Sequence, residues 1–193
     1  MNDFKYFIVN KPFNVLSQFS EEGPKPTLKT VGSFPTDVYP VGRLDADSEG
    51  LLILTNDKNV THKLMHPSME KSKEYLVQVE GEITQEAIQK LITGVEIRIK
   101  GKTHQTSKAF VSKIDAPSLP ERIPPIRVRQ SIPTSWISIT ITEGKNRQIR
   151  RMTAAVGFPT LRLVRTRIQN LQLDFNDSVI EMNKEELYSL IGI

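Results

Sequence analysis

The sequence predicts an α+β fold built around a mixed, largely antiparallel sheet, because segments with strand periodicity outnumber those with helical periodicity. The clearest strand covers residues 136–142, where three isoleucines alternate with serine and threonines, as in a strand buried on one face. Residues 51–54 form a continuous apolar run, which is typical of a strand covered on both faces. Together these segments predict a sheet that carries the core.

Three further elements are predicted in the first half of the chain. Residues 5–10 (KYFIVN) have strand composition. Residues 73–79 alternate between polar and apolar side chains, so they predict a second half-buried strand. After them, apolar residues recur at helical spacing from near Thr84 to Gly94, which predicts an amphipathic helix.

The second half contains a proline-rich stretch and another helix. Residues 116–133 include five prolines, so we expect an extended loop there. Asn146 follows a glycine-containing turn and is the expected N-cap of a helix, which Gly157 and Pro159 end about three turns later.

The length and composition exclude several classes of protein. The 193 residues suffice for one sizeable core or two small lobes, and no repeat divides them. The absence of cysteine excludes disulfides, thiolate metal sites and thiol nucleophiles. No apolar run approaches the roughly 20 residues that span a bilayer, and the N-terminus does not resemble a signal peptide. We therefore expect a cytoplasmic protein that does not bind membranes.

Positive charge is concentrated in the last third of the chain. The net charge is only +4, but residues 144–173 contain seven basic residues and no acidic one. Six of the seven are arginines, which bind phosphate through two hydrogen bonds and stack on bases. The seven are Lys145, Arg147, Arg150, Arg151, Arg162, Arg165 and Arg167. This composition favours a nucleic-acid partner, although a run of charge can also be ordinary solvated surface.

The helix expected after Asn146 separates apolar from basic side chains. One side of the helical wheel carries Ile149, Met152 and Val156. The other side carries Arg147, Arg150 and Arg151. Cations in the first turn oppose the helix dipole, so an anionic partner is expected opposite them, either a phosphate or a carboxylate.

Three carboxylates immediately precede the buried strand at 51–54. Asp45, Asp47 and Glu49 fall within VGRLDADSEG, which predicts an acidic turn anchored by that strand. Such a turn can simply be solvated, because carboxylates favour turns. The surrounding residues nevertheless indicate a functional site.

This run, VGRLDADSEGLLILTND at 41–57, resembles the G-R-L-D-x-x-S-E-G-L-L-L-L-T-N-D motif of bacterial ribosomal RNA pseudouridine synthases of the RsuA type. KEYLVQVEG at 73–81 resembles the tyrosine motif of that family, and EGKNRQIRRM at 143–152 resembles its basic motif. Residues 124–165 are most similar to the branch that modifies large-subunit rRNA. The similarity extends from residue 7 to near residue 173.

The resemblance implies that residues 1–193 form a single catalytic domain with the pseudouridine synthase fold, in which two lobes flank a basic catalytic cleft. It also implies isomerisation of a uridine in large-subunit (23S) rRNA to pseudouridine without a cofactor or metal. The expected partner is ribosomal RNA, either free or in a ribosome precursor, and we expect a monomer. Many relatives carry an additional N-terminal RNA-binding domain of the S4 type, which we do not expect here because the match begins so early.

By the same resemblance, Asp45 is the catalytic aspartate, acting as a nucleophile or as a base. Tyr75 stacks on the target base, although by spacing alone a tyrosine on an apolar strand face is more often core. Arg150 forms an ion pair with Asp45, with Arg147 as the second candidate. RNA-binding roles are expected for Arg43, Arg127, Arg129, Lys145, Arg147, Arg151, Arg162 and Arg165, of which Arg151 and Arg165 are expected to be exposed phosphate contacts.

Three alternatives use the same residues. Asp45, Asp47 and Glu49 match the first ligand positions of an EF-hand loop, but Asn56 stands where a glutamate is required. A metal-dependent nuclease could combine these carboxylates with His62 or His66. A non-catalytic RNA-binding module would explain the arginines and leave the aspartate motif without a role.

Overall fold

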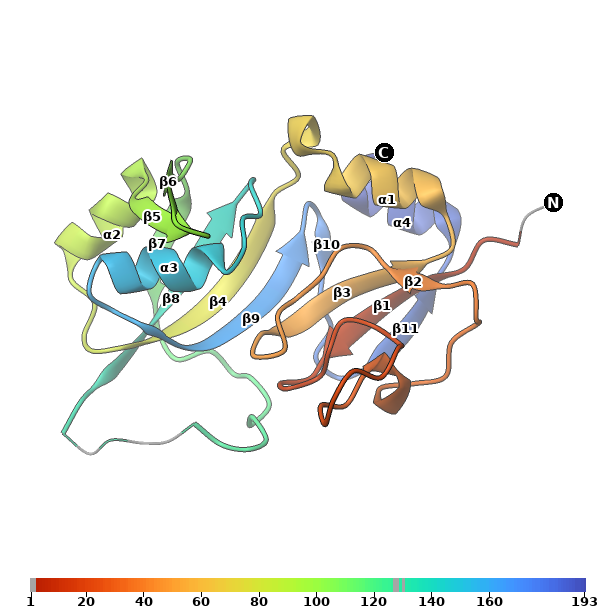
Figure 1. Ribbon diagram of the computed structural model, residues 1–193, viewed down its shortest axis with the longest axis horizontal. Coiled ribbons are helices and arrows are strands. Elements are labelled where there is room, and N and C mark those ends of the chain that lie inside the picture. The colour runs from red at the N-terminus through yellow and green to blue at the C-terminus, as the bar shows by residue number, and fades with distance from the viewer. Residues whose placement is uncertain (1–2, 127–128, 130) are drawn as a thin grey trace. The chain divides into compact units, whose positions relative to one another are not determined.

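The computed structural model describes residues 3–126, 129 and 131–193, and it divides the chain into two compact units. The first unit comprises Met1–Lys71 and Arg165–Ile193, and the second comprises Ser72–Val164. The described residues form eleven strands and four α-helices. In both units strands pair antiparallel (Figure 1). The predicted α+β class with a largely antiparallel sheet is therefore confirmed. No described helix is long and apolar enough to cross a membrane.

The sheet of the first unit has the strand order β11-β1-β3-β9. Strand β1 confirms the strand predicted at 5–10, and β3 confirms the one predicted at 51–54. Strand β9 contributes its residues from Arg165 onward to this unit. The strand bounds are β1 Tyr6–Lys11, β2 Tyr39–Pro40, β3 Glu49–Thr55, β9 Thr160–Ile168, β10 Leu171–Gln172 and β11 Val179–Met182.

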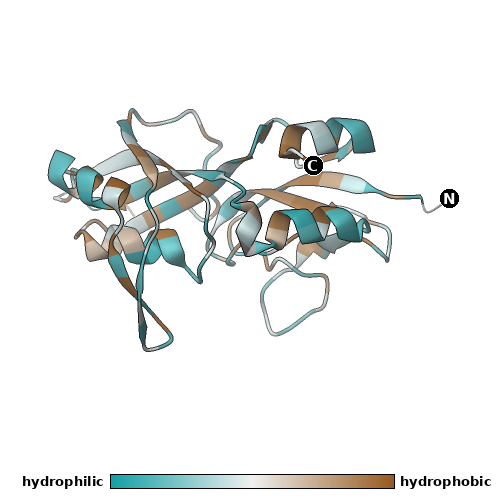
Figure 2. Cartoon of the chain, turned by 90° about the horizontal axis from the view of Figure 1, so that it is seen from above, coloured by the Kyte–Doolittle hydropathy of each residue, from teal (hydrophilic) through white to brown (hydrophobic). Residues whose placement is uncertain are grey.

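Both faces of β3 are covered, which explains its uninterrupted apolar sequence. Leu51 and Ile53 pack on the side of helices α1 (Lys58–Met65) and α4 (Lys184–Ile191), which contribute buried side chains to the same cluster. Leu52 and Leu54 belong to a second cluster, formed largely with residues of the N-terminal loops, including the short 3-10 helix Leu28–Thr30. Figure 2 shows hydrophobic colouring along the strands and hydrophilic colouring on much of the helices.

The sheet of the second unit has the order β9-β4-β8-β7, to which β9 contributes its residues up to Val164. Strands β4 and β8 confirm the two half-buried strands predicted at 73–79 and 136–142. A separate hairpin is formed by β5 and β6. The bounds are β4 Lys73–Glu80, α2 Gln85–Thr93, β5 Glu96–Ile99, β6 Lys102–Gln105, β7 Phe110–Ile114, β8 Thr134–Ile141 and α3 Gln148–Ala155.

Helix α2 forms where the sequence predicts it. The Thr84 hydroxyl accepts a hydrogen bond from the Ala87 backbone N–H, and Gly94 ends the helix with a φ of 99°. Its buried residues Ala87, Ile88 and Leu91 form the expected apolar face.

Helix α3 differs from the prediction at its start and in its length. Its N-cap is Arg147, in the left-handed conformation, so the prediction of Asn146 as N-cap is wrong. The physical reason lies in Gln148, whose side chain accepts from the Lys145 backbone N–H and donates to Glu143. These bonds fix the entry to the helix one residue later. The helix ends at Ala155, so it is shorter than the predicted three turns.

The proline-rich stretch 116–133 forms no helix or strand among its described residues, as expected for a loop. Arg122 donates hydrogen bonds to the carbonyl oxygens of Pro124 and Pro125, so part of this loop is held by its own side chains.

Candidate active site

Asp45 lies in the loop that joins β2 to β3, and several hydrogen bonds fix this loop within the first unit. The Ser17 hydroxyl donates to the Leu44 carbonyl oxygen at 2.8 Å and accepts from the Leu44 N–H at 3.0 Å. The Asn14 N–H donates to the Ala46 carbonyl oxygen at 2.7 Å, and the Ser48 N–H donates to the Asp45 carbonyl oxygen at 3.0 Å. The backbone on both sides of the half-buried Asp45 is therefore held in place.

A buried lysine supports this loop from the end of β1. Lys11 is 0% exposed, and its ammonium group donates to the carbonyl oxygens of Pro12 and Val15, each at 2.8 Å, and of Ala46 at 3.5 Å. Burial lowers the pKa of Lys11 to about 8, although the carboxylates of Glu49, Asp47 and Asp45 oppose the shift. A cation thus lies close to all three acidic side chains.

Sequence reasoning missed Lys11. The signal present in the sequence was a lysine at the end of an apolar strand, directly before a proline. That pattern does not reveal burial, because a lysine at a strand end is ordinarily solvated.

Gly50 brings β3 and β9 together directly after the acidic turn. Its φ is 101°, and a Cβ at this position would lie 2.2 Å from the Arg165 carbonyl oxygen. Only glycine fits such a contact. The Arg165 side chain is only 5% exposed, and its Nε donates to the Leu51 carbonyl oxygen at 2.7 Å. The expectation that Arg165 is an exposed phosphate contact is therefore wrong, because its guanidinium group is buried against β3.

Glu49 and the histidines do not form a metal site among the described residues. Glu49 is the first residue of β3 and is buried, so the expectation that it lies on the turn is wrong. In an EF-hand the loop would continue beyond this position, whereas here β3 begins, so the structure contradicts the EF-hand alternative. His62 lies within α1 and His66 is its C-cap. No described group of three or more His, Asp or Glu side chains has the spacing to hold a metal ion.

Tyr75 and Arg150 both lie in the second unit. Tyr75 is 8% exposed and pairs with Ile139 of β8, on the same face as Val77 and Val79. Most of its ring is therefore core, and only a small part of the side chain is accessible. Arg150 is half-buried on α3, and its Nη1 lies 3.5 Å from the Thr160 carbonyl oxygen.

The apolar side of α3 is as predicted for two of its three residues. Ile149 and Met152 are buried, whereas Val156 follows the helix as its C-cap and is half-buried. Arg151 is half-buried and donates to the Asn146 carbonyl and side-chain oxygens and to the Arg98 carbonyl oxygen. Its donors join α3 to β5 and to the preceding turn, so Arg151 is less exposed than expected, and its RNA-binding role stays a prediction.

The remaining basic candidates differ in their surroundings. Lys145 and Arg147 are exposed at the start of α3, and exposed Arg43 donates to the Gln18 side-chain oxygen at 3.4 Å. Arg162 donates to the Pro120 carbonyl oxygen at 2.9 Å, and Arg129 forms an ion pair with Glu80 at 3.1 Å. Arg127 lies outside the described residues.

Comparison with known proteins identifies the class to which these features belong. Residues 5–155 match the family model described as RNA pseudouridylate synthase. A protein of Xanthomonas axonopodis pv. citri named Ribosomal large subunit pseudouridine synthase E is 51% identical over 170 residues, covering 86% of this chain and 87% of that protein. A Vibrio parahaemolyticus protein of the same name is 49% identical over 170 residues, covering 88% of this chain and 69% of that protein.

The fold comparison agrees with the family match. A solved structure described as a pseudouridylate synthase aligns with a TM-score of 0.80 at 24% sequence identity, covering 98% of this chain and 75% of the other. The family model spans the Asp45 loop, Tyr75 and Arg150 in one continuous match. The chain therefore belongs to the RNA pseudouridylate synthase family and is an RNA pseudouridine synthase.

Proposed function

We propose that the protein converts a uridine of large-subunit (23S) ribosomal RNA to pseudouridine, with Asp45 as the catalytic residue and without a cofactor. The names of the relatives that are about 50% identical support ribosomal RNA as the substrate. The substrate is rRNA or a ribosome precursor, and the protein acts in the cytoplasm as a monomer.

The reaction is balanced within the nucleotide. The bond between N1 of the uracil and C1′ of the ribose breaks, and a bond between C5 and C1′ forms. The hydrogen on C5 leaves as a proton, and N1 gains one. Since nothing is oxidised or reduced and no water is added, a single carboxylate can serve where glycoside hydrolysis uses a pair.

The observation that carries the proposal is the construction of the Asp45 loop. Hydrogen bonds to the backbone on both sides of Asp45 hold the loop that carries its carboxylate, and Lys11 places a buried cation nearby. Rigid placement of a reacting group supplies much of the rate enhancement in reactions of this kind. Asp45 acts as a nucleophile or as a base at the ribose.

Two residues of the second unit complete the proposed machinery. Tyr75 holds the uracil against the accessible part of its ring after the base has been flipped out of its stack. Arg150 pairs with Asp45 and keeps it ionised. Both roles rest on the match of their motifs to the family.

Replacement of Asp45 by Asn tests the proposal. The variant should form no pseudouridine under single-turnover conditions on 23S rRNA, while its affinity for that RNA stays within about tenfold of wild type, roughly 1.4 kcal/mol. Asp47→Asn is the matched control, because Asp47 belongs to the same loop and also acts electrostatically on Lys11. The control should keep substantial activity.

A near-normal rate for Asp45→Asn would show that the chemistry resides elsewhere. Loss of activity in both variants with loss of thermal stability would instead show that the loop had collapsed, so melting temperatures are measured alongside the rates.

A further inference from the structure

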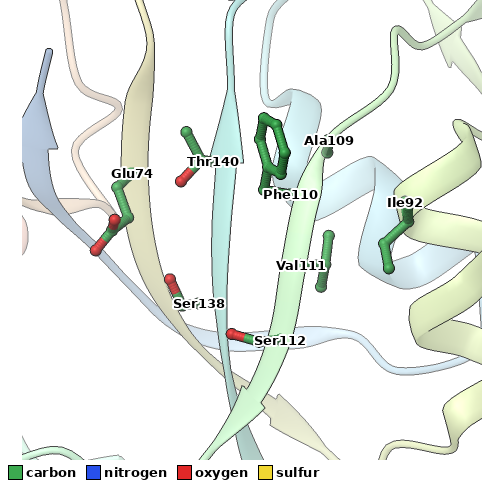
Figure 3. A pocket seen from close by; sticks show the side chains of 8 residues that line it. All are labelled: Glu74, Ile92, Ala109, Phe110, Val111, Ser112, Ser138 and Thr140. Carbon is green, nitrogen blue, oxygen red and sulfur yellow. The ribbon is translucent and has the colours of Figure 1, made fainter.

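Phe110, the first residue of β7, is unusually exposed for an aromatic side chain. It is 82% exposed, and among the large hydrophobic residues that the structure describes only Ile123 is more exposed. Single exposed apolar residues are common on protein surfaces. Phe110, however, forms one wall of a groove within the second unit (Figure 3).

Strand register determines which side chains stand beside Phe110. Phe110 pairs with Thr140 of β8, and Thr140 pairs with Glu74 of β4, so the three residues form a row across the sheet. Ser112 pairs with Ser138 in the next row on the same face. The groove has a volume of about 420 Å³ and is lined by Glu74, Ile92, Ala109, Phe110, Val111, Ser112, Ser138 and Thr140.

This row faces away from the proposed site of the target uracil. Glu74 and Tyr75 are consecutive residues of β4, so their side chains point to opposite faces of the sheet. Tyr75 is buried on one face, which it shares with Val111 at the edge of the groove, whereas Phe110, Thr140 and Glu74 lie on the other. A ligand beside Phe110 would therefore be separate from the uracil held by Tyr75.

The lining chemistry suits a planar molecule with polar edges. The Phe110 ring offers a face for stacking, while the hydroxyls of Ser112, Ser138 and Thr140 can each donate and accept hydrogen bonds. An aliphatic side chain or an acyl chain would leave these hydroxyls without water or partners, which is unfavourable. A nucleobase offers both a π-face and hydrogen-bonding edges.

The charges favour a base over a phosphate inside the groove. Among the described residues that line the groove, Glu74 is acidic and none is basic, so the lining offers no cation to a phosphate (Figure 3). Lys108, two residues before Phe110, is exposed and can meet the backbone of a strand that passes outside.

We infer that this surface, the Phe110 groove, binds an unpaired base of the RNA substrate other than the uridine that is modified. The inference rests on the proposed function, since it requires an RNA substrate. Through this groove the second unit makes a contact that helps to select single-stranded or bulged RNA. Because the hydroxyls donate and accept equally well, the contact tolerates different bases.

The test measures the affinity of the full chain for a single-stranded RNA of mixed sequence about ten nucleotides long, within the range of known single-stranded site sizes. Phe110→Ala and Phe110→Leu should each weaken binding roughly tenfold, whereas Phe110→Trp should retain wild-type affinity because it keeps a ring face. Tyr39→Ala is the matched control, since Tyr39 is a 63% exposed aromatic residue in the first unit. Its affinity should be unchanged.

Activity assays distinguish this inference from the proposed function. On 23S rRNA, Phe110→Ala should need a higher RNA concentration for half-maximal rate and should reach the wild-type rate at saturation. Wild-type affinity of Phe110→Ala would overturn the inference while leaving the proposed function intact. Wild-type affinity of Phe110→Leu would also overturn the inference, because an apolar contact without stacking would then suffice.

A change in sedimentation mass for Phe110→Ala, with unchanged RNA affinity, would identify the groove as a contact between two copies of the chain. That result would equally overturn the inference. Failure of the wild-type protein to modify 23S rRNA would refute the proposed function by itself.

Discussion

Tyr75 belongs to the core and still keeps a small part of its side chain exposed. Its ring packs in the row formed with Ile139, and 8% of the residue remains exposed. We expect Tyr75→Phe to retain most activity, because the face of the ring is preserved. Tyr75→Ala should lose activity through loss of stacking worth about 1–3 kcal/mol and should also be less stable, because it leaves a cavity.

Single-turnover rates and urea unfolding of both Tyr75 variants separate the two effects. A folded Tyr75→Ala protein with the wild-type rate would show that the residue is core only.

Arg150 is predicted to affect the rate more than RNA affinity. Arg150→Ala should lower the single-turnover rate even at saturating RNA, since removal of one partner leaves the other charge uncompensated. Arg162→Ala is a suitable control, because that arginine donates to the Pro120 carbonyl oxygen and is expected to bind RNA, so its variant should reach the wild-type rate at saturating RNA. If Arg150→Ala reaches the wild-type rate at saturation, Arg147 becomes the candidate partner of Asp45.

The sequence proposes candidate site residues, but it does not predict which basic side chains are buried. Asp45, Tyr75 and Arg150 can be named as candidates because they fall within recognisable motifs, and their roles stay predictions. The roles of Lys11 and Arg165 could not be predicted, because both depend on burial created by long-range contacts. A basic residue in a sequence is normally expected at the surface, and here Lys11 and Arg165 lie inside the first unit.

The N-cap of helix α1 joins a network of polar side chains in the first unit. Asp57 caps it by accepting from the Asn59 N–H, and its other oxygen accepts from the hydroxyls of Tyr6 and Tyr188 at 2.9 and 2.6 Å. Burial alone would raise the pKa of Asp57, but the hydrogen bonds from Tyr188, Tyr6 and Asn59 bring it below its ordinary value. Asp57 therefore joins α1 to β1 and α4.

Removal of this carboxylate should destabilise the protein. Asp57→Ala is expected to lower the free energy of unfolding by about 3 kcal/mol, because it removes a cap and leaves two tyrosine hydroxyls without their acceptor. Asn183→Ala, which removes the cap of the equally long helix α4, should cost only about 1 kcal/mol. Chemical denaturation near pH 7 measures both.

The pH dependence gives a second check on Asp57. A carboxyl whose pKa is lower in the folded state contributes stability above its unfolded pKa, near 3.9, and loses it as the pH falls through the folded value. The stability difference between wild type and Asp57→Ala should thus shrink below about pH 4. A difference that stays constant down to pH 2 would contradict the proposed network.

Elements are predicted well where capping and periodicity agree. Helix α2 begins and ends at the expected residues because Thr84 and Gly94 give local signals. The start of α3 was misplaced because the Gln148 side chain bonds to Lys145 and Glu143, an arrangement that the local cap preferences do not encode.

At the scale of the whole molecule, only some of the basic side chains after residue 144 are accessible to RNA. Lys145 and Arg147 are exposed, whereas Arg165 is buried and Arg151 is bonded to backbone oxygens. The run of charge therefore combines RNA-binding candidates with residues that stabilise the fold.

The salt dependence of RNA binding should reveal this division. Arg147→Gln should reduce the magnitude of the slope of log K against log salt by about 0.7, as for one phosphate contact of a single strand. Arg165→Gln should leave that slope unchanged and lower the melting temperature instead, because it removes a buried hydrogen bond to Leu51. An Arg147 variant with the wild-type slope would exclude Arg147 from phosphate contact.

The division of the chain into Ser72–Val164 and two flanking segments also has a consequence for synthesis on the ribosome. The second unit is continuous, so all of its residues are available before the first unit is complete. Strand β1 can pair with β3 early, but its other edge pairs with Val179–Met182, more than 160 residues later in the chain. During translation β1 therefore presents an unpaired edge until β11 emerges, a period in which nascent chains are prone to aggregate.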